Sequence, residues 1–299
     1  MLILFVGDGR LGNQVFQYSA LASIADRKSL IVAVGLEDLS DVFELHGPRC
    51  AVVPGGVWMK RIVKYVFRPL LLRPIARWLR LISYGRELDS PGPYSGGDGR
   101  LYVRRGLLPG VLFVDGGYYQ NSDFWPVVFP PRALRLREQW RVAAQRTIEA
   151  AAATLEKPIF LHIRRSDYLG FTTYGLTNLV LPTQYFRSGI ARVRERLGPR
   201  RLLIVTDDPK WAEREFADIP DRAVVSGHPI VDFAVMAECA GGVVSNSTFS
   251  FVAALFIRDP GIVLAPEYWF GFRVRQWLPP RMRFAHRHIE YLPISEGTA

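Results

Sequence analysis

The segment LILFVGDGRLGNQVFQYSALASIADR, residues 2–27, determines how the first part of this chain folds. An apolar run, Leu2–Val6, leads into a turn that contains Gly7, Gly9 and Gly12, and a helical pattern follows. This G-x-G-x-x-G order after a strand is typical of a turn that binds a dinucleotide. A glycine fingerprint alone is a weak signal, so the rest of the chain has to decide what the turn serves.

The elements around this turn predict a βαβ unit. The strand Leu2–Val6 is followed by a helix over Asn13–Arg27 and a strand over Ser29–Val34. Farther along, Pro131–Glu156 is rich in Ala and Arg and is typical of a helix that connects two domains. We therefore predict an N-terminal α/β domain over residues 1–150.

A second alternation of strands and helices predicts a Rossmann-like domain over residues 151–299. The strand PIFLHIRR begins at Pro158, a helix begins at Pro182–Thr183, and the strand RLLIVTDDP ends in an acidic turn. The fold class is therefore α/β, with two Rossmann-like domains. Two such blocks, each with a parallel sheet, put a ligand cleft between them.

The composition limits the classes of protein to which this chain can belong. The chain has 299 residues, 49% of them hydrophobic, which is enough for buried cores. The apolar N-terminal run is short and no basic region leads into it, so it reads as a strand and not as a signal peptide. No run of about 18 uncharged apolar residues predicts a membrane span. Cys50 and Cys239 form no ligand pattern and indicate reduced thiols in a cytoplasmic protein. The net charge of +10 is mostly arginine, which favours a phosphate-bearing partner.

The segment HIRRSDY, His162–Tyr168, is the sharpest signal of chemistry. Strand alternation puts His162 and Arg164 on one face and Arg165 on the other. The segment ends a buried strand, where open α/β sheets bind ligands. A diphosphate would satisfy these cations bidentately. Alternatively, Asp167 pairs with an arginine across a domain interface.

Two further polar groups end strands in the same block. Asp207 and Asp208 follow RLLIVT, where a carboxylate accepts from a ribose hydroxyl or a guanine N–H, or simply caps the helix at Pro209. The segment NSTFSF, Asn246–Phe251, is typical of an anion site at a helix N-terminus, or of plain capping by Asn246 or Ser247. The pair of carboxylates has no histidine, cysteine or further carboxylate cluster beside it, so no metal site is predicted.

Five segments together resemble one family, the α-1,2-fucosyltransferases of glycosyltransferase family 11. They are RLGNQVFQY (10–18), GGYYQNSDFW (116–125), HIRRSDY (162–168), LLIVTDDPKWA (202–212) and DFAVMAECAGGVVSNSTFSFVAALF (232–256). The resemblance implies a GT-B-like fold whose domains face each other across a donor-binding cleft, with residues 1–150, including the basic segment 58–86, on the acceptor side and residues 151–299 binding the GDP-sugar. It implies GDP-fucose as donor, a galactoside of a surface glycan as acceptor, inversion at the anomeric carbon, and no cofactor or required metal.

The resemblance also implies roles for individual residues. Arg164 is expected to bind the β-phosphate as the catalytic cation, with His162 beside it. The other residues expected at the donor are Gly12, Asn13, Arg165, Asp167, Asp207, Asp208, Asn246, Ser247, Thr248 and Ser250. Among these, Asp208 would read the guanine or ribose, and Asn13 would reach across the cleft. The turn GDGRLG is then the family's GRLGNQ turn, with Gly7 as an extra glycine upstream.

The chain departs from the family pattern at two places, and one role stays open. Ser166 stands where the family more often has glycine. Phe251–Ala253 stand where tryptophans are usual, which puts the acceptor in doubt more than the donor. The base for the acceptor hydroxyl is unassigned; Asp8 is the first candidate, ahead of Asp123 and Glu267.

Three alternatives to fucosyl transfer remain. The first is a related transferase that uses another GDP-sugar. The second is a nicotinamide oxidoreductase, but Glu37 lies a little late for the acidic residue that such a site needs, and HIRRSDY would be unexplained. The third is a non-enzymatic basic protein that binds a membrane surface. No motif predicts nucleic-acid binding beyond the charge itself.

The segment Trp58–Arg86 carries the densest positive charge. It has no acidic residue, and its basic residues are Lys60, Arg61, Lys64, Arg68, Arg73, Arg77, Arg80 and Arg86. Its apolar residues could pack on the first domain while the cations lie in water. Alternatively, this face rests peripherally on the anionic cytoplasmic leaflet, where the enzyme would meet a lipid-linked glycan.

Overall fold

The computed structural model describes residues 1–54, 65, 82–87, 101–121, 124, 130–152, 156–259 and 261–294. Most of the basic segment Trp58–Arg86 lies outside these ranges, and so does the candidate base Asp123. No helix within these ranges is long and apolar enough to cross a membrane.

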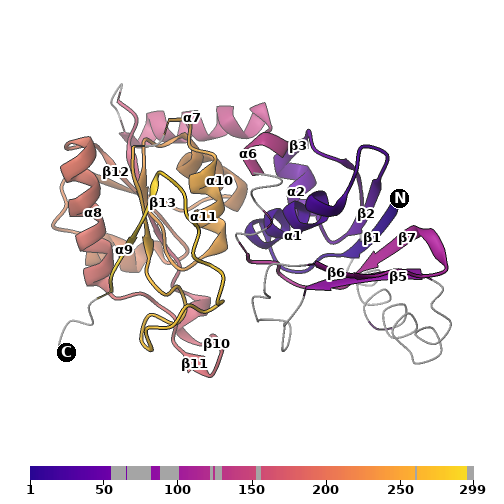
Figure 1. Cartoon of the computed structure of the whole chain (residues 1–299). Helices are drawn as coiled ribbons and strands as arrows, with labels where there is room; N and C mark the ends of the chain where they lie inside the picture. Colours follow the sequence, from indigo (N-terminus) through magenta and orange to yellow (C-terminus); the bar gives the residue numbers. More distant parts are fainter. Residues whose placement is uncertain are drawn as a thin grey trace. The chain divides into compact units, whose positions relative to one another are not determined.

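The chain divides into two compact units, Met1–Arg135 and Leu136–Ala299 (Figure 1). The region expected to form one connecting helix consists of α6 (Pro130–Ala133), β8 (Leu134–Leu136) and α7 (Glu138–Ala152). Helix α7 belongs to the second unit, so the division falls earlier than residue 150. It packs on α10 (Pro229–Glu238), where the Arg141 side chain donates to Glu238 over 3.0 Å.

The first unit is built on a six-stranded sheet that begins with the predicted strand β1 (Leu2–Val6). Strand β1 pairs in parallel with β2 (Leu30–Val34) on one side and with β7 (Leu108–Val114) on the other. The sheet order is β4-β2-β1-β7-β5-β6, with β4 at Arg49–Val53, β5 at Ile82–Glu87 and β6 at Leu101–Arg104. Chain order reverses between β1 and β7, and ligands bind at such a point in open α/β sheets.

Helix α1 (Leu11–Ile24) follows β1 and forms the predicted βαβ unit with β2. It begins two residues before Asn13 and ends three before Arg27. Most of its side chains are buried, including two glutamines, Gln14 and Gln17. Helix α2 (Glu37–Val42) and β3 (Phe43–Leu45), which pairs with β8, complete the described elements of this unit.

The second unit has a parallel six-stranded sheet. Its order is β13-β12-β9-β14-β15-β16, with bounds Arg222–Val225, Leu202–Thr206, Ile159–Ile163, Gly242–Val243, Val263–Pro266 and Ile289–Leu292. Numbered along the chain, these strands run 3-2-1-4-5-6, which is the Rossmann order. Every residue of β9 and β12 is buried, as apolar strands covered on both faces require. The order reverses between β9 and β14.

Helices cover this second sheet. Helix α8 (Thr183–Leu197) begins after Pro182, and the predicted face of Tyr185, Phe186, Ile190 and Val193 is buried, with Leu197 packed against the same core. The other helices are α9 (Pro209–Glu215), α10 and α11 (Thr248–Leu255), and a short hairpin joins β10 (Thr172–Thr173) to β11 (Leu176–Thr177). The predicted α/β class is confirmed in both units.

Candidate functional site

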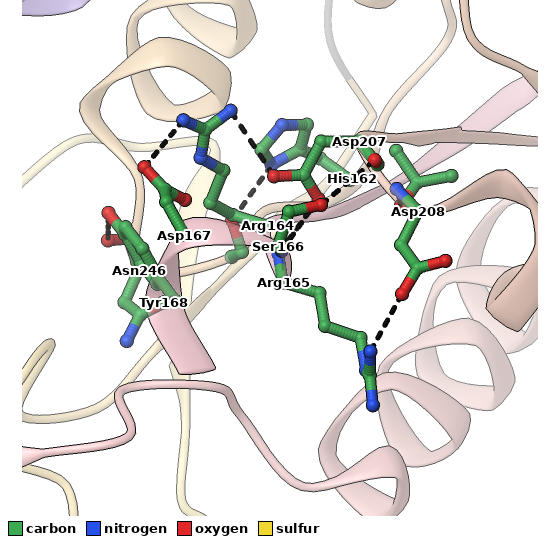
Figure 2. A network of polar contacts seen from close by, with 11 residues as sticks. His162, Arg164, Arg165, Ser166, Asp167, Tyr168, Asp207, Asp208 and Asn246 are labelled. Atoms are coloured by element: carbon green, nitrogen blue, oxygen red, sulfur yellow. Dashed lines mark hydrogen bonds and ion pairs between the residues drawn. The ribbon is translucent and has the colours of Figure 1, made fainter. Parts of the chain in front are cut away.

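Loops that follow β9, β12 and β14 meet at the carboxyl edge of the second sheet (Figure 2). Because the three strands are parallel neighbours, the residues after Ile163, Thr206 and Val243 emerge side by side. The reversal of strand order falls between β9 and β14, within this group. The predicted signals HIRRSDY, VTDDP and NSTFSF therefore come together at one edge.

Arg164 lies at the centre of this edge, between two carboxylates. Its Nη2 donates to Asp167 Oδ2 over 2.7 Å, and its Nη1 lies 3.3 Å from Asp207 Oδ2. The side chain is 39% exposed, so part of it is accessible to a ligand. The sequence left open whether an arginine serves a ligand or pairs with Asp167 across a domain interface; Arg164 does pair with Asp167, but within the same loop. An anion that binds here would share the guanidinium with these carboxylates.

Arg165 points to the other side of the loop. Its Nη1 donates to Asp208 Oδ2 over 2.7 Å, and its guanidinium lies 4.9 Å from the centre of the Trp211 ring. Its backbone N–H donates to Asp207 Oδ1 over 2.9 Å. These contacts fasten the loop after β9 to the loop after β12, so Arg165 holds the position of its neighbour Arg164.

The two aspartates after β12 serve different partners. Asp207 Oδ1 accepts from the backbone of Arg165, and its carbonyl accepts from Ser166 Oγ over 3.0 Å. Asp208 is the N-cap of α9, because its Oδ1 accepts from Trp211 N over 3.2 Å. The capping alternative for Asp208 is therefore confirmed, and each oxygen of this carboxylate already accepts a hydrogen bond.

His162 is buried beneath Arg164. Its Nδ1 lies 2.8 Å from Ser245 Oγ, which joins the end of β9 to the segment after β14, and its ring lies 5.7 Å from that of Phe249. Burial, and secondarily the cation of Arg164, lower the pKa of His162 to about 3. The imidazole is therefore neutral at physiological pH and fixes the site, rather than carrying charge or exchanging protons there.

Because His162 is buried and neutral, we predict that the folded chain loses stability in acid. Its pKa is lower in the folded chain than in the unfolded chain, so the unfolded state takes up the proton first and stability falls as pH drops below about 6.5. The free energy of unfolding decreases by roughly 1.4 kcal/mol for each pH unit, until the pH reaches the pKa of His162 in the folded chain, near 3. In urea unfolding at pH 6.5 and 5.0, we expect His162→Gln to lose less stability between the two pH values than wild type. The exposed His46→Gln should retain the wild-type difference. Equal acid losses in wild type and His162→Gln would contradict the assignment.

The NSTFSF segment leads into α11. Ser247 is the N-cap residue, although its side chain makes no capping bond, and Thr248 is the first helical residue. Asn246 does not cap: its Nδ2 donates to Leu179 O over 2.8 Å, and its carbonyl accepts from Tyr168 Oη over 3.1 Å. Ser250 is fully buried and donates to Ser247 O over 3.3 Å. The helix N-terminus thus faces the edge that holds Arg164, while Asn246 and Ser250 brace it.

The candidate base Glu267 directly follows β15 in the second unit, whereas Asp8, Gly12 and Asn13 lie in the first unit, at the reversal between β1 and β7. The carboxylate of Asp8 accepts from Gly9 N over 2.8 Å, and Gly9 has φ +84°, which glycine adopts without strain. Gly12 is buried within α1. Asn13 Oδ1 accepts from Gln120 Nε2 over 2.8 Å.

Glutamines of α1 hold this turn, a role that the sequence did not predict. Gln17 Nε2 donates to Asp8 O over 2.9 Å and to Gly117 O over 2.8 Å, so it ties the loop after β1 to the loop after β7. Gln14 Nε2 donates to Gly9 O over 3.1 Å. The glycines therefore permit a tight turn that side chains of the following helix then fasten.

Asp232 is the other functional candidate that sequence reasoning missed. It lies in the first turn of α10, is 9% exposed, and its Oδ2 accepts from Gly227 N over 3.3 Å. Its Oδ1 is buried and has no hydrogen-bond partner in the part of the chain that the structure describes. Burial raises the pKa of Asp232. A polar residue inside the apolar run PIVDFAVMAE was the available signal.

Among the described residues, no group of three or more His, Cys, Asp or Glu side chains could hold a metal ion. The carboxylates at the sheet edge are paired with Arg164 and Arg165 instead. We expect catalytic turnover to be unchanged in excess EDTA, measured against the same reaction with added magnesium or manganese. Complete loss in chelator, restored by either ion, would contradict the metal-independent assignment.

Comparison with known proteins adds the family. The family model for glycosyl transferase family 11 matches residues 117–273. The chain is 33% identical over 116 residues to the O-antigen biosynthesis glycosyltransferase WbnK of Escherichia coli, a match that covers 37% of this chain and 38% of that protein. It is 24% identical over 270 residues to the galactoside 2-alpha-L-fucosyltransferase Sec1 of Mus musculus, covering 86% of this chain and 65% of that protein. The chain thus spans less than two thirds of the length of either relative.

Solved structures support the fold. The α-1,6-fucosyltransferase NodZ, from a crystal soaked with GDP-fucose, gives a TM-score of 0.51 at 15% identity and covers 87% of this chain and 96% of that one. POFUT1 in complex with GDP gives a TM-score of 0.50 at 15% identity, covering 88% and 97%. The GT-B-like class predicted from the sequence is confirmed. Because the family model covers more than half of the chain and includes the whole arginine-bearing edge, the chain belongs to glycosyl transferase family 11.

Proposed function

We propose that this protein transfers L-fucose from GDP-fucose to a galactoside hydroxyl, in α-1,2 linkage and with inversion. The observation that carries the proposal is Arg164, half-exposed at the point of strand reversal and held between Asp167 and Asp207. The similarity to Sec1 and the ligands named for NodZ and POFUT1 favour fucose, GDP and a galactoside.

The diphosphate of the donor would bind between Arg164 and the N-terminus of α11. The guanidinium supplies a fork for phosphate oxygens, and the first N–H groups of the helix, at Ser247 and Thr248, supply further donors. Ser250 and Asn246 act through the backbone that they brace. In this arrangement no metal ion is needed to neutralise the diphosphate.

We propose that Asp232 reads the nucleobase. The sequence assigned this role to Asp208, but Asp208 caps α9 and pairs with Arg165. Asp232 lies on α10, which packs on α11, and its Oδ1 has no hydrogen-bond partner among the described residues. The N1–H and N2–H groups of guanine match a carboxylate.

In the proposed reaction the acceptor hydroxyl attacks C1 of fucose as the bond from C1 to the β-phosphate oxygen breaks, and GDP leaves. The transition state is oxocarbenium-like, as in other glycosyl chemistry. Negative charge grows on the β-phosphate, and Arg164 stabilises it. His162 keeps Arg164 and the α11 segment in register through Ser245. Asp8, exposed beside the first-unit turn, is kept as the candidate base.

The direct test is product analysis with GDP-fucose and a panel of β-galactosides, with linkage determined by NMR. An α-1,2-fucosylated product confirms the proposal. Transfer from GDP-mannose in preference to GDP-fucose would establish the alternative of another GDP-sugar, and absence of GDP binding would remove the transferase assignment.

The membrane-surface location also remains a proposal. We expect the protein to co-sediment with vesicles that contain anionic lipid at low ionic strength and to be released by high salt, because each basic residue adds on the order of 1 kcal/mol near such a surface. The variant with Arg73, Arg77 and Arg80 changed to glutamate should stay in the supernatant. Wild type that fails to sediment with anionic vesicles would exclude this location.

A further inference from the structure

An aromatic surface lies beside the Arg164 site and is not used by the donor assignments above. Phe171 is 36% exposed, and Leu169, on the same loop, is 46% exposed. The ring of Phe171 stacks on that of Tyr168, with centroids 6.0 Å apart and an interplanar angle of 18°. Tyr168 in turn meets the edge of Phe270 at 6.0 Å. Phe171 is therefore an exposed ring with a firm aromatic support.

This surface is next to the proposed phosphate site. The Arg164 guanidinium lies 6.0 Å from the centre of the Tyr168 ring, so a single ring separates the cation from Phe171. Figure 2 shows Tyr168 beside Asn246, and its hydroxyl donates to Asn246 O. Because Asn246 follows β14, the aromatic surface extends from β9 toward β14.

The nucleoside would lie in the opposite direction. Asp232 lies on α10, which packs on α7 and α11 and whose Phe233 contacts Phe249 of α11, whereas the loop that carries Phe171 leads into α8 on the other face of the sheet. A donor whose base is read at Asp232 and whose β-phosphate lies at Arg164 therefore directs its sugar away from α10, toward the loop that carries Phe171. In-line displacement requires the attacking hydroxyl on the side of C1 away from the phosphate. The acceptor follows the fucose in this same direction.

We propose that Phe171, supported by Tyr168, is the platform for the acceptor sugar and positions a terminal galactose by stacking against its apolar face. This inference rests on the proposed fucosyl transfer. The axial 4-hydroxyl of galactose leaves the C–H bonds of C3, C4 and C5 together on one face of the ring, and such a face packs on an aromatic plane. Phe171 carries no polar atom, so it is a positioning residue for the acceptor and contributes no proton transfer.

The test separates acceptor binding from donor binding. For the best β-galactoside of the panel, Phe171→Ala should raise the KM for the acceptor about 10-fold, because an aromatic contact contributes about a tenfold change in affinity. The Kd for GDP and the rate of GDP-fucose hydrolysis without acceptor should be unchanged. Phe171→Tyr should keep the wild-type KM, whereas Phe171→Leu, apolar but not planar, should recover only part of it. Leu107→Ala, which removes an exposed apolar side chain of the first unit, is the control.

Each other outcome overturns a different statement. An unchanged acceptor KM in Phe171→Ala overturns the platform, and a parallel loss of GDP affinity assigns the ring to the nucleotide instead. Wild type that hydrolyses GDP-fucose but transfers to no β-galactoside overturns the galactose assignment while leaving the donor site intact. Wild type that neither binds GDP nor consumes GDP-fucose refutes the proposed function itself.

Discussion

Arg164→Ala should lower kcat for fucosyl transfer by about 100- to 1000-fold, the cost of removing a preorganised donor from a developing negative charge. The loss has a second source in this site. Without the guanidinium, Asp167 and Asp207 would face the diphosphate unneutralised, because Arg164 bridges both carboxylates. We therefore expect the affinity for GDP to fall together with kcat.

Arg164→Lys should recover only a small part of the activity. A lysine restores one positive charge, but it cannot hold two carboxylates and a phosphate with a planar fork. Measurement of kcat and of the Kd for GDP, with thermal unfolding as a check on the fold, distinguishes the two variants. Arg192→Ala is a matched control, because Arg192 is similarly exposed and pairs with Glu195 on α8. A folded Arg164→Ala that turns over within threefold of wild type would contradict the donor-site assignment.

The strands and helices with a clear apolar pattern were predictable from the sequence. The apolar runs of β9 and β12 favour buried strands, and the 3.6-residue period of α8 favours a helix. The helix α10 was missed because PIVDFAVMAE is apolar on nearly every side and has no helical period. The expected single helix over Pro131–Glu156 was wrong at its start, where the chain forms β8 and pairs with β3.

The candidate site was predictable as a set of strand ends, but not as a network. Parallel strands bring HIRRSDY, VTDDP and NSTFSF to one edge, and this follows from strand order alone. The strand period placed Arg164 and Arg165 on opposite faces, but no local pattern encodes the side-chain contacts that hold each of them. Arg165 turns away because Asp208 and Trp211 hold it, and those partners lie more than 40 positions farther along the chain.

The role of Asp232 could not be predicted from the sequence for a different reason. An acidic residue in the first turn of a helix normally indicates a favourable interaction with the helix dipole, which needs no ligand. Two properties separate Asp232 from that ordinary case: its burial, and an Oδ1 that has no hydrogen-bond partner among the described residues. Both properties depend on how α10 packs in the folded unit.

Asp232→Asn should change which nucleotide the protein binds. An asparagine offers one acceptor and one donor, so it opposes the two adjacent N–H groups of guanine but matches the N1 acceptor and the N6 amino donor of adenine. We expect the affinity for GDP to fall about 100-fold, near the 3 kcal/mol of a hydrogen bond to a charged group, while the affinity for ADP does not fall. Titration calorimetry with GDP, IDP and ADP measures this, and IDP, which lacks the N2 amino group, should lie between the other two in wild type.

The same variant should be at least as stable as wild type in the absence of nucleotide. Burial raises the pKa of Asp232, so the folded state binds a proton more readily than the unfolded state, and the buried charge lowers stability as pH rises above the ordinary range of an aspartate. Asp232→Asn removes that charge. Glu238→Gln, at the far end of the same helix, breaks the pair with Arg141 and should lose stability without losing GDP affinity. Loss of GDP binding with no loss of thermal stability therefore identifies a carboxylate kept for its ligand, whereas a parallel loss of both would make Asp232 an ordinary structural residue.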